Sequence, residues 1–439
     1  ELRKTDGTTT GTVIAKDIRP GNIRFSPDSK TTDLSAIGNL VYFIANDGEH
    51  GTELWKSDGT VAGTVLVKDI NPGSGSAYPN NLTNVNGTLF FVANNGSSGG
   101  ELWKSDGTAA GTVLVKDIRA GTSSSYLDDL TNVNGTLYFK ADDGSNGKEL
   151  WKSDGTAAGT VMVKDIKSGS ASPYLDELTN VNGILFFKAD DDSSGNELWK
   201  SDGTTAGTVM VKDIRAGSSG SNPDQLTNFN GTLYFEANDG SNGYELWKSD
   251  GTAAGTVMVK DIRAGGNSSP DHLINVNGTL YFEADDGSSG RELWKSDGTA
   301  AGTGLFVDIH AGPGSSVPTQ LTVAGGRMFF TADDGIHGRE LWSTDGTANG
   351  TRISREIRPG TVRPLIQAMQ PLSNGVLLFR ADDGSTGLDP WRSDGTAAGT
   401  YRLIDGPPLH GETAQFAAAA TGGWAVFNHT DPVHGQELW

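Results

Sequence analysis

The segment Glu149-Leu150-Trp151-Lys152-Ser153-Asp154-Gly155-Thr156 recurs along the whole chain and constrains the fold more than any other feature. Successive copies are 48 residues apart, except for one interval of 47 and one of 49. A fixed period in this range indicates stacked supersecondary units and takes precedence over local preferences. The tryptophans that mark the copies are Trp55, Trp103, Trp151, Trp199, Trp247, Trp294, Trp342 and Trp391.

Each period is predicted to contain four short strands joined by turns. In the clearest period these are strand A (Asp129–Val133), strand B (Thr136–Ala141), strand C (Glu149–Ser153) and strand D (Thr160–Ile166). Asn134-Gly135 predicts a two-residue hairpin between A and B, because a type I′ turn needs positive φ at both positions. No segment shows a 3.6-residue apolar period, so the chain is predicted to be all-β.

Both faces of each predicted sheet carry apolar side chains. Leu137 and Phe139 alternate with Tyr138, and Leu150 alternates with Trp151. A sheet covered on both faces, with four strands in about 48 residues, is typical of a β-propeller blade. We therefore predict one propeller domain spanning 1–439. Its blades are 33–70, 81–118, 129–166, 177–214, 225–262, 272–309, 320–357, 368–405, and 413–439 together with 12–18.

The chain ends predict how the ring closes. The N-terminus supplies a lone D strand, Thr12–Ile18, and the C-terminus supplies A, B and C strands ending at Trp439. Together they make a ninth four-stranded blade. The alternative is a fragment of a longer open repeat array whose ends do not meet. The repeats diverge in the first D-to-A connection (Arg19–Thr32), at Pro390 in the eighth C strand, and in the Ala417–Ala420 run of the ninth blade.

Composition limits the partners of the protein. The formal charge is -20 and the pI is about 4.7, which argues against nucleic acid and anionic membrane surfaces as partners. No apolar run approaches the roughly 18 to 20 residues of a membrane span. The chain has no Cys, so its stability is expected from packing, hydrogen bonds or metal ions.

The repeat resembles the ELWxxDGT repeat family of secreted bacterial proteins. Glu-Leu-Trp-Lys-Ser-Asp-Gly-Thr is that family's signature, and the likeness covers the whole chain. It implies a segment of a larger exported bacterial protein, extracellular or on the cell surface, without an established catalytic activity. The Ser-Asp-Gly-Thr turn also looks like the Asp-box turn of sialidase-like propellers, but it lacks that motif's spacing.

The repeated Trp and Asp residues have a structural and a functional interpretation. The tryptophans could stack on carbohydrate, but we expect them to fill the core, since a strand with two apolar faces needs both Leu and Trp. The aspartates of the Asp-Gly-Thr turns are expected to accept hydrogen bonds within their own turns. They are Asp58, Asp106, Asp154, Asp202, Asp250, Asp297, Asp345 and Asp394.

The loops between strands B and C are the best chemical candidates. They contain adjacent carboxylates with Gly and Ser or Asn, which is suitable oxygen chemistry for Ca²⁺. The spacing is too short for an EF-hand, and Asn replaces Asp in three repeats, so the alternative is a turn held by its own Asx side chains. No cofactor is required, and calcium is the one predicted candidate. The candidate ligands are Asp142, Asp143, Asp190, Asp191, Asp285, Asp286, Asp333, Asp334, Asp382 and Asp383.

Other titratable residues do not form a recognisable catalytic motif. His50, His337 and His434 occupy the same B–C loop position, whereas His310, His410 and His429 lie elsewhere. No nucleophile, phosphate-loop, dinucleotide or zinc spacing is present. The sector of blades seven to nine is unusually basic, with Arg355, Arg358, Arg363 and Arg380 beside Glu356.

Three functions remain open. The first is a non-enzymatic binding, adhesion or scaffold propeller that presents repeated acidic loops to a glycan, matrix or protein partner, since repetition suits multivalent binding. The second is a polysaccharide hydrolase or lyase with its site at the channel mouth in blades seven to nine. The third is a structural module of a surface fibre. We expect the first.

Overall fold

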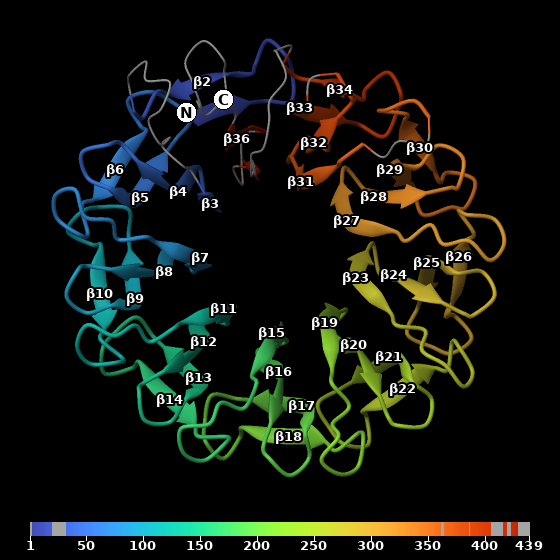
Figure 1. The fold of residues 1–439 in the computed structure, drawn as a ribbon, viewed down its shortest axis with the longest axis horizontal. Coiled ribbons are helices and arrows are strands. Elements are labelled where there is room, and N and C mark those ends of the chain that lie inside the picture. Colours follow the sequence, from blue (N-terminus) through green and yellow to red (C-terminus); the bar gives the residue numbers. More distant parts are fainter. Residues whose placement is uncertain are drawn as a thin grey trace. The chain divides into compact units, whose positions relative to one another are not determined.

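The computed structural model describes residues 2–19, 32–360, 364–385, 387–404, 416–418 and 423–428. These residues form nine antiparallel sheets of four strands, and no helix occurs among them. The protein is a β-propeller with nine blades, as the repeat predicts (Figure 1). No helix of the described ranges could cross a membrane.

Blades 1 to 8 each contain strands A to D in chain order. Blade 1 is β3 (Thr32–Ile37), β4 (Leu40–Asn46), β5 (Thr52–Ser57) and β6 (Val65–Lys68). Blade 2 is β7 (Asn80–Val85), β8 (Thr88–Asn94), β9 (Gly100–Ser105) and β10 (Val113–Lys116). Blade 3 is β11 (Asp128–Val133), β12 (Thr136–Asp142), β13 (Lys148–Ser153) and β14 (Val161–Lys164). Blade 4 is β15 (Asp176–Val181), β16 (Ile184–Asp190), β17 (Asn196–Ser201) and β18 (Val209–Lys212).

The same order continues in the second half. Blade 5 is β19 (Asp224–Phe229), β20 (Thr232–Asn238), β21 (Tyr244–Ser249) and β22 (Val257–Lys260). Blade 6 is β23 (Asp271–Val276), β24 (Thr279–Asp285), β25 (Arg291–Ser296) and β26 (Gly304–Val307). Blade 7 is β27 (Thr319–Ala324), β28 (Arg327–Asp333), β29 (Arg339–Thr344) and β30 (Arg352–Arg355). Blade 8 is β31 (Gln367–Pro371), β32 (Leu377–Asp382), β33 (Leu388–Ser393) and β34 (Tyr401–Arg402).

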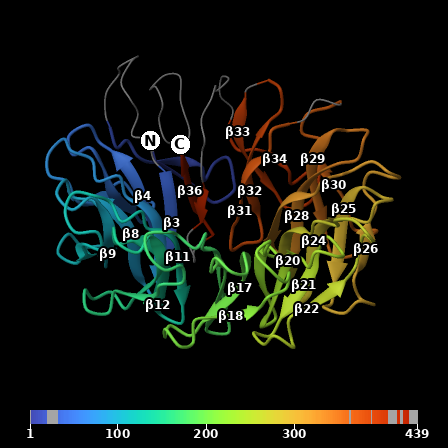
Figure 2. The same cartoon turned by 60° about the horizontal axis from the view of Figure 1, so that its bottom comes forward.

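The ninth blade corrects one prediction. Its strand order is β2 (Val13–Lys16), β1 (Leu2–Thr5), β36 (Ala425–Asn428) and β35 (Phe416–Ala418). The N-terminus therefore supplies both a C and a D strand, rather than a lone D strand, and the C-terminus supplies A and B. The N-terminal segment lies beside β36 (Figures 1 and 2). Leu2 pairs with Asn428 and Thr5 with Ala425.

The physical reason is that the first residues are themselves a copy of the motif, so they fit the C-strand position beside β36. Leu2 is fully buried with Val41, Trp55 and Val426. The C-terminal copy at 437–439, and residues 20–31 and 419–420 of the divergent segments, lie outside the described residues.

Blades 3 to 6 pack against one another through their faces. In the core between blades 3 and 4, Tyr138, Leu150 and Val163 of blade 3 meet Leu185, Phe187 and Trp199 of blade 4. Leu and Trp of one C strand thus face opposite sides, as alternation predicts. The ring centroids of Phe187 and Trp199 are 6.5 Å apart. This burial on both faces is the main apolar stabilisation of each blade.

The chain comprises two compact units. One contains Glu1–Ser124, Thr322–Phe329 and Glu340–Trp439, and the other contains Ser125–Leu321 and Phe330–Arg339. We call them the first and second units. The ninth blade belongs to the first unit, and blades 3 to 6 belong to the second.

Strand direction places two kinds of loop at one edge of each blade. Because the strands are antiparallel, the end of B, the start of C, the end of D and the start of A coincide. Asp142 at the end of β12 donates its N–H to the carbonyl of Ser125 just before β11. We call this side, formed by the B–C loops and D–A connections, the loop edge. The opposite edge carries the Asn134-Gly135 turn, where φ is +51° and +88°.

Candidate binding site at the loop edge

The repeated tryptophans belong to the core as expected, except Trp342, which is half-buried. Seven of them are only 5–6% exposed, so they offer no platform to a saccharide. A cation from the preceding blade covers several rings: Lys164 Nζ lies 5.6 Å from the Trp199 centroid, and Lys212 Nζ lies 5.8 Å from that of Trp247. The seven are Trp55, Trp103, Trp151, Trp199, Trp247, Trp294 and Trp391.

The aspartates of the Asp-Gly-Thr turns are structural in the same way. Asp202 Oδ1 accepts hydrogen bonds from the N–H and hydroxyl of Thr204 at 2.8 and 2.7 Å. The Thr204 hydroxyl in turn accepts the N–H of Gly207. A Cβ at Gly207 would lie 2.1 Å from the Asp202 carboxylate, which explains the second glycine of the motif. Hydrogen bonds from Thr204 lower the pKa of Asp202.

The glutamate of each ELW segment is a structural residue that the sequence pattern did not reveal. Glu197 is fully buried and accepts hydrogen bonds from the N–H groups of Ile214, Arg215 and Ser221 and from the Ser221 hydroxyl. It therefore holds the D–A connection against its own C strand. The equivalent glutamates, all 0% exposed, are Glu53, Glu101, Glu149, Glu197, Glu245, Glu292 and Glu340.

The predicted calcium loops satisfy their carboxylates within the turn. Asp142 Oδ1 accepts the N–H of Gly144, and Asp143 Oδ1 accepts those of Ser145 and Asn146. Burial works to raise the pKa of Asp143, but these hydrogen bonds outweigh it and lower the pKa. The same pattern occurs at Asp190 and Asp191, Asp285 and Asp286, Asp333 and Asp334, and Asp382 and Asp383. Calcium binding there stays a prediction.

Basic residues of the D–A connections neutralise the first Asp of several loops. Lys167 Nζ lies 3.0 Å from Asp190 and 2.6 Å from Asp192. Arg263 pairs with Asp285 in the same way. In the first unit Arg358 lies 3.7 Å from Asp382. These pairs join the D–A connection of one blade to the B–C loop of the next.

The other predicted residues do not converge on a catalytic site. Arg355 donates to the carbonyl of Thr400 and covers Trp391, and buried Arg380 donates to the carbonyl of Leu388. His337 Nδ1 bonds Asp334 of its own loop at 2.7 Å. Similarly, His50 bonds Asp47. The predicted residues Arg363, His410, His429 and His434 lie outside the described residues.

A backbone feature recurs at the loop edge of blades 1 to 8. The second residue of each A strand has φ between +48° and +62°. In blades 1 to 6 and in blade 8 it also sits at a shift of register with strand B. Such a residue is a β-bulge, and bulges re-aim side chains. Its identity changes in nearly every blade although the rest of the unit repeats: Asp33, Asn81, Asp129, Glu177, Gln225, His272, Gln320 and Ala368.

Two further positions beside the bulge also change from blade to blade. One is on strand B and the other is the first residue of strand C. In blades 1 to 8 they carry Ile44 and Thr52, Val92 and Gly100, Lys140 and Lys148, Lys188 and Asn196, Glu236 and Tyr244, Glu283 and Arg291, Thr331 and Arg339, and Arg380 and Leu388. Variation within the array is thus concentrated at the loop edge.

A pocket of about 400 Å³ lies at this edge between blades 3 and 4. Its lining includes Lys140, Lys148 and Lys188 together with Asp176 and Asn196, and it also includes Ser172, Tyr174 and Leu175. Lys140 bonds Asp129 at 2.8 Å and lies 3.6 Å from Asp176. The pocket therefore combines ammonium, carboxylate, amide and hydroxyl groups.

Exposed tyrosines stand beside this pocket. Tyr174 is 68% exposed and Tyr126 is 57% exposed, and both have φ of +50°. Lys167 Nζ lies 5.5 Å from the Tyr174 ring, and Lys148 Nζ lies 5.6 Å from the Tyr126 ring. In the first unit Tyr78 has the corresponding position and is 66% exposed. The sequence did contain a signal for these residues, since they occupy positions where the repeats differ.

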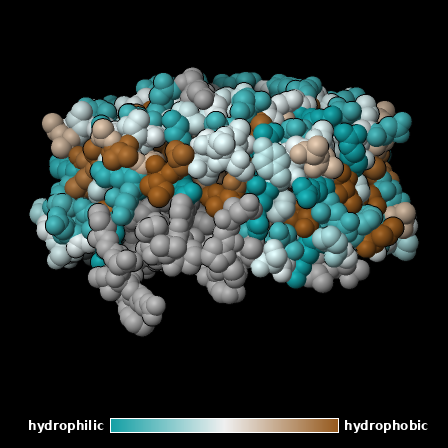
Figure 3. Space-filling view, turned by 90° about the horizontal axis from the view of Figure 1, so that it is seen from above, coloured by the Kyte–Doolittle hydropathy of each residue, from teal (hydrophilic) through white to brown (hydrophobic). Residues whose placement is uncertain are grey.

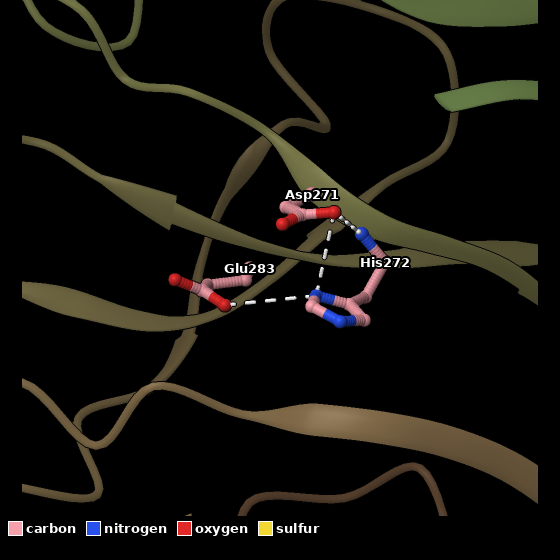
Figure 4. Close-up of side chains that lie close together, drawn as sticks. All are labelled: Asp271, His272 and Glu283. Carbon is pink, nitrogen blue, oxygen red and sulfur yellow. Dashed lines mark hydrogen bonds and ion pairs between the residues drawn. The ribbon is translucent and has the colours of Figure 1, made fainter. Parts of the chain in front are cut away.

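The loop edge of blades 5 and 6 is chemically different. Asp271 and Glu283 lie close to His272 (Figure 4). Arg291 bonds Glu283 at 2.7 Å. On blade 5, burial raises the pKa of Glu236 to about 7, with a further contribution from nearby Asp224 and Asp271. The same scaffold thus carries a lysine-rich edge in blades 3 and 4 and a carboxylate-rich edge in blades 5 and 6.

No protein-family model matches the chain, and no curated protein sequence matches it. Solved structures that resemble it include a prolyl endopeptidase (11% identity, TM-score 0.44, 81% of this chain and 55% of that one). Others are puromycin hydrolase (15%, 0.42, 80% and 58%) and oligopeptidase B from Leishmania major (12%, 0.44, 82% and 55%). The chain therefore covers less than two thirds of each of these proteins.

Proposed function

We propose that the protein is a non-enzymatic binding module of an exported bacterial protein, and that it recognises a glycan at the loop edge of blades 3 and 4. The observation that carries this proposal is the pocket around Lys140, Lys148, Lys188 and Tyr174. It lies where the repeats differ in side chain while sharing one backbone. The resemblance of the motif to a family of secreted proteins supports the proposed location outside the cell.

The chemistry of the pocket suits a ligand with many hydroxyl groups. Carboxylates accept hydrogen bonds from hydroxyls, ammonium groups donate to them, and an amide such as that of Asn196 does both. Lys148 and Lys188 both line the pocket. Lys148 lies over the Tyr126 ring and Lys188 acts electrostatically on Asp176, so each ammonium group keeps N–H donors for a ligand. The exposed Tyr174 ring offers an apolar face for the C–H groups of a sugar ring, because aromatic side chains are rigid and amphipathic.

The pocket lining supports a polar ligand rather than an apolar one, because three lysines, an aspartate and an asparagine contribute to it. On the side drawn in Figure 3, which is the upper side of the view in Figure 1, hydrophobic residues also lie in small groups between hydrophilic ones. A stable apolar partner generally needs a larger continuous patch. Repetition adds avidity, since Tyr126 and Tyr174 place two exposed rings on one unit.

A glycan array followed by isothermal titration calorimetry tests the proposal. Tyr174→Asn is a suitable variant because Asn222 occupies the same position in the next blade with φ of +47°, so the backbone is retained. We expect this variant to weaken glycan affinity by on the order of tenfold, the loss of one to two kcal/mol of aromatic contact.

The matched control is Ile336→Ala, which removes a side chain that is 69% exposed in another blade. This control should bind as the unchanged protein does. Absence of any glycan ligand, or equal binding by Tyr174→Asn, would contradict the proposal.

A further inference from the structure

The only group of three potential metal ligands found among the described residues lies at the loop edge of blade 6. One oxygen of Asp271, one of Glu283 and Nδ1 of His272 all lie within 4.8 Å of one another (Figure 4). His272 Nδ1 is 3.4 Å from Asp271 Oδ1 and 3.7 Å from Glu283 Oε2. None of these three residues belongs to the predicted calcium loops.

We propose that Asp271, His272 and Glu283 bind one divalent transition-metal ion such as Zn²⁺. Zn²⁺ takes His nitrogen and carboxylate oxygen at about 2.0 to 2.2 Å, so ligand atoms in a tetrahedral site stand about 3.3 to 3.6 Å apart. The distance from His272 Nδ1 to Asp271 Oδ1, 3.4 Å, falls within that range, and the distance to Glu283 Oε2, 3.7 Å, lies just above it. An imidazole ligand favours Zn²⁺ over Ca²⁺, which takes oxygen ligands.

The state of His272 supports a ligand role. Its Nδ1 atom is shielded from solvent and has no hydrogen-bond partner, although it points between two carboxylates. A buried polar atom without a partner is unfavourable unless a further group satisfies it. A metal ion placed between Nδ1 and the two carboxylate oxygens would do so.

The surroundings hold the proposed ligands in place. Glu283 is 1% exposed, and Arg291 bonds its Oε1, which leaves Oε2 directed at His272. Asp271 Oδ1 accepts the backbone N–H of His272 at 2.7 Å. Hydrogen bonds of this kind orient ligands in metal sites. Asp224 of blade 5 acts electrostatically on the same Glu236 as Asp271 does, so a further carboxylate lies beside the cluster.

Comparison with the neighbouring blades shows that the arrangement is specific to blade 6. At the position of His272 the flanking blades carry Gln225 and Gln320, with φ of +58° and +57°. In blade 5 the corresponding set, Asp224, Gln225 and Glu236, has no imidazole. His272→Gln therefore removes the nitrogen ligand while restoring a side chain that this backbone already holds elsewhere.

The test uses the whole chain, freed of metal by a chelator, and titrates it with ZnCl₂ in a calorimeter. We expect one equivalent of Zn²⁺ to bind, and His272→Gln to weaken that binding by at least on the order of 10- to 100-fold. Co²⁺ should give the visible absorption bands of a low-symmetry site in the unchanged protein and not in the variant. Zn²⁺ should also raise the melting temperature of the unchanged protein alone.

The matched control is His337→Asn, which removes another imidazole bonded to an Asp and introduces the residue that Asn146 and Asn242 supply in other blades. It should bind Zn²⁺ normally. The proposal is wrong if the unchanged protein binds no zinc, if His272→Gln binds it equally, or if only His337→Asn loses it. These outcomes are independent of glycan binding, so each proposal can fail alone.

Discussion

At the scale of the residue, the most informative comparison is between equivalent buried glutamates. Glu197 receives hydrogen bonds from the N–H and hydroxyl of Ser221. In the preceding blade Pro173 stands at the position of Ser221 and has no N–H to donate. Burial raises the pKa of Glu149 to about 8, with fewer hydrogen bonds to oppose it.

These environments predict different effects on stability for the same substitution, Glu→Gln, at the two positions. Glu149→Gln should leave stability at pH 5 nearly unchanged, because the native side chain is already protonated there. Glu197→Gln should cost about 1–3 kcal/mol, because the amide N–H₂ replaces one carboxylate oxygen and leaves two of the four donors facing another donor. Urea denaturation of both variants at pH 5 checks the contrast. Equal losses would contradict it.

The raised pKa also predicts a pH dependence. Native Glu149 keeps its proton up to about pH 8, whereas an unfolded Glu releases it near 4.5. The contribution is fully present below pH 4.5 and is lost as pH rises to about 8, by at most about 5 kcal/mol. The urea midpoint of the unchanged protein should therefore fall over this range more steeply than that of Glu149→Gln. Parallel curves for the two proteins would show that Glu149 is ionised in the native state.

At the scale of the element, the hairpins of a blade repeat along the chain, whereas the side chains at its loop edge differ from blade to blade. Strand D is the shortest, since Ile166 leaves the ladder to donate its N–H to Glu149. Blade 6 departs from the pattern, with Gly304 at the first position of its D strand where blades 1 to 5 carry Val. A Cβ at Gly304 would meet nothing within 4 Å.

Gly304→Val is accordingly predicted to stabilise the protein by about 0.5–1 kcal/mol, since Gly weakens strands and Val favours them. Gly302→Ala in the same hairpin should destabilise it, because its Cβ would lie 2.1 Å from the Asp297 carboxylate. Thermal melts of the two variants should shift in opposite directions. A shift of the same sign in both would contradict the assignment of Gly302 as a required glycine and of Gly304 as a weakening one.

The sequence predicted those features that depend on the 48-residue repeat and on the alternation of side chains along each strand. The strands of blade 3, the Asn134-Gly135 turn and the buried Trp151 follow from local rules, and the structure confirms them. The cluster of Asp271, His272 and Glu283 could not be predicted, because it depends on a bulge that aims side chains of two strands at one point. The pocket between blades 3 and 4 likewise depends on packing between repeats.

At the scale of the whole molecule, the two chain ends share one sheet. The predicted division of strands between the two chain ends was wrong. Residues 1–3 and 437–439 both carry part of the repeated motif, so either end could supply the C strand of the ninth blade. The period of the repeat does not decide which of them pairs with the B strand. The observed seam joins β1 to β36 over four residue pairs. Leu2 at this seam is as buried as Leu198 in blade 4.

Leu2→Ala should destabilise the seam by about 2–5 kcal/mol through the cavity it leaves. The loss should appear as faster amide hydrogen exchange in β35 and β36 as well as in β1, with blades 3 to 6 unchanged. Leu198→Ala should instead speed exchange in β16 to β18. Exchange confined to β1 after Leu2→Ala would show that the chain ends are not coupled.

The bulge at the second residue of strand A has an evolutionary consequence. Its backbone accepts Asp, Asn, Glu, Gln, His and Ala alike, so recognition can diverge by single codon changes while the tryptophans, glutamates and turns that keep a blade folded stay untouched. A gene that grows by duplicating such a unit gains, with each copy, a new adjustable position already placed at the loop edge. The number of different side chains at that edge then increases with the number of blades, without any change in the fold of a blade.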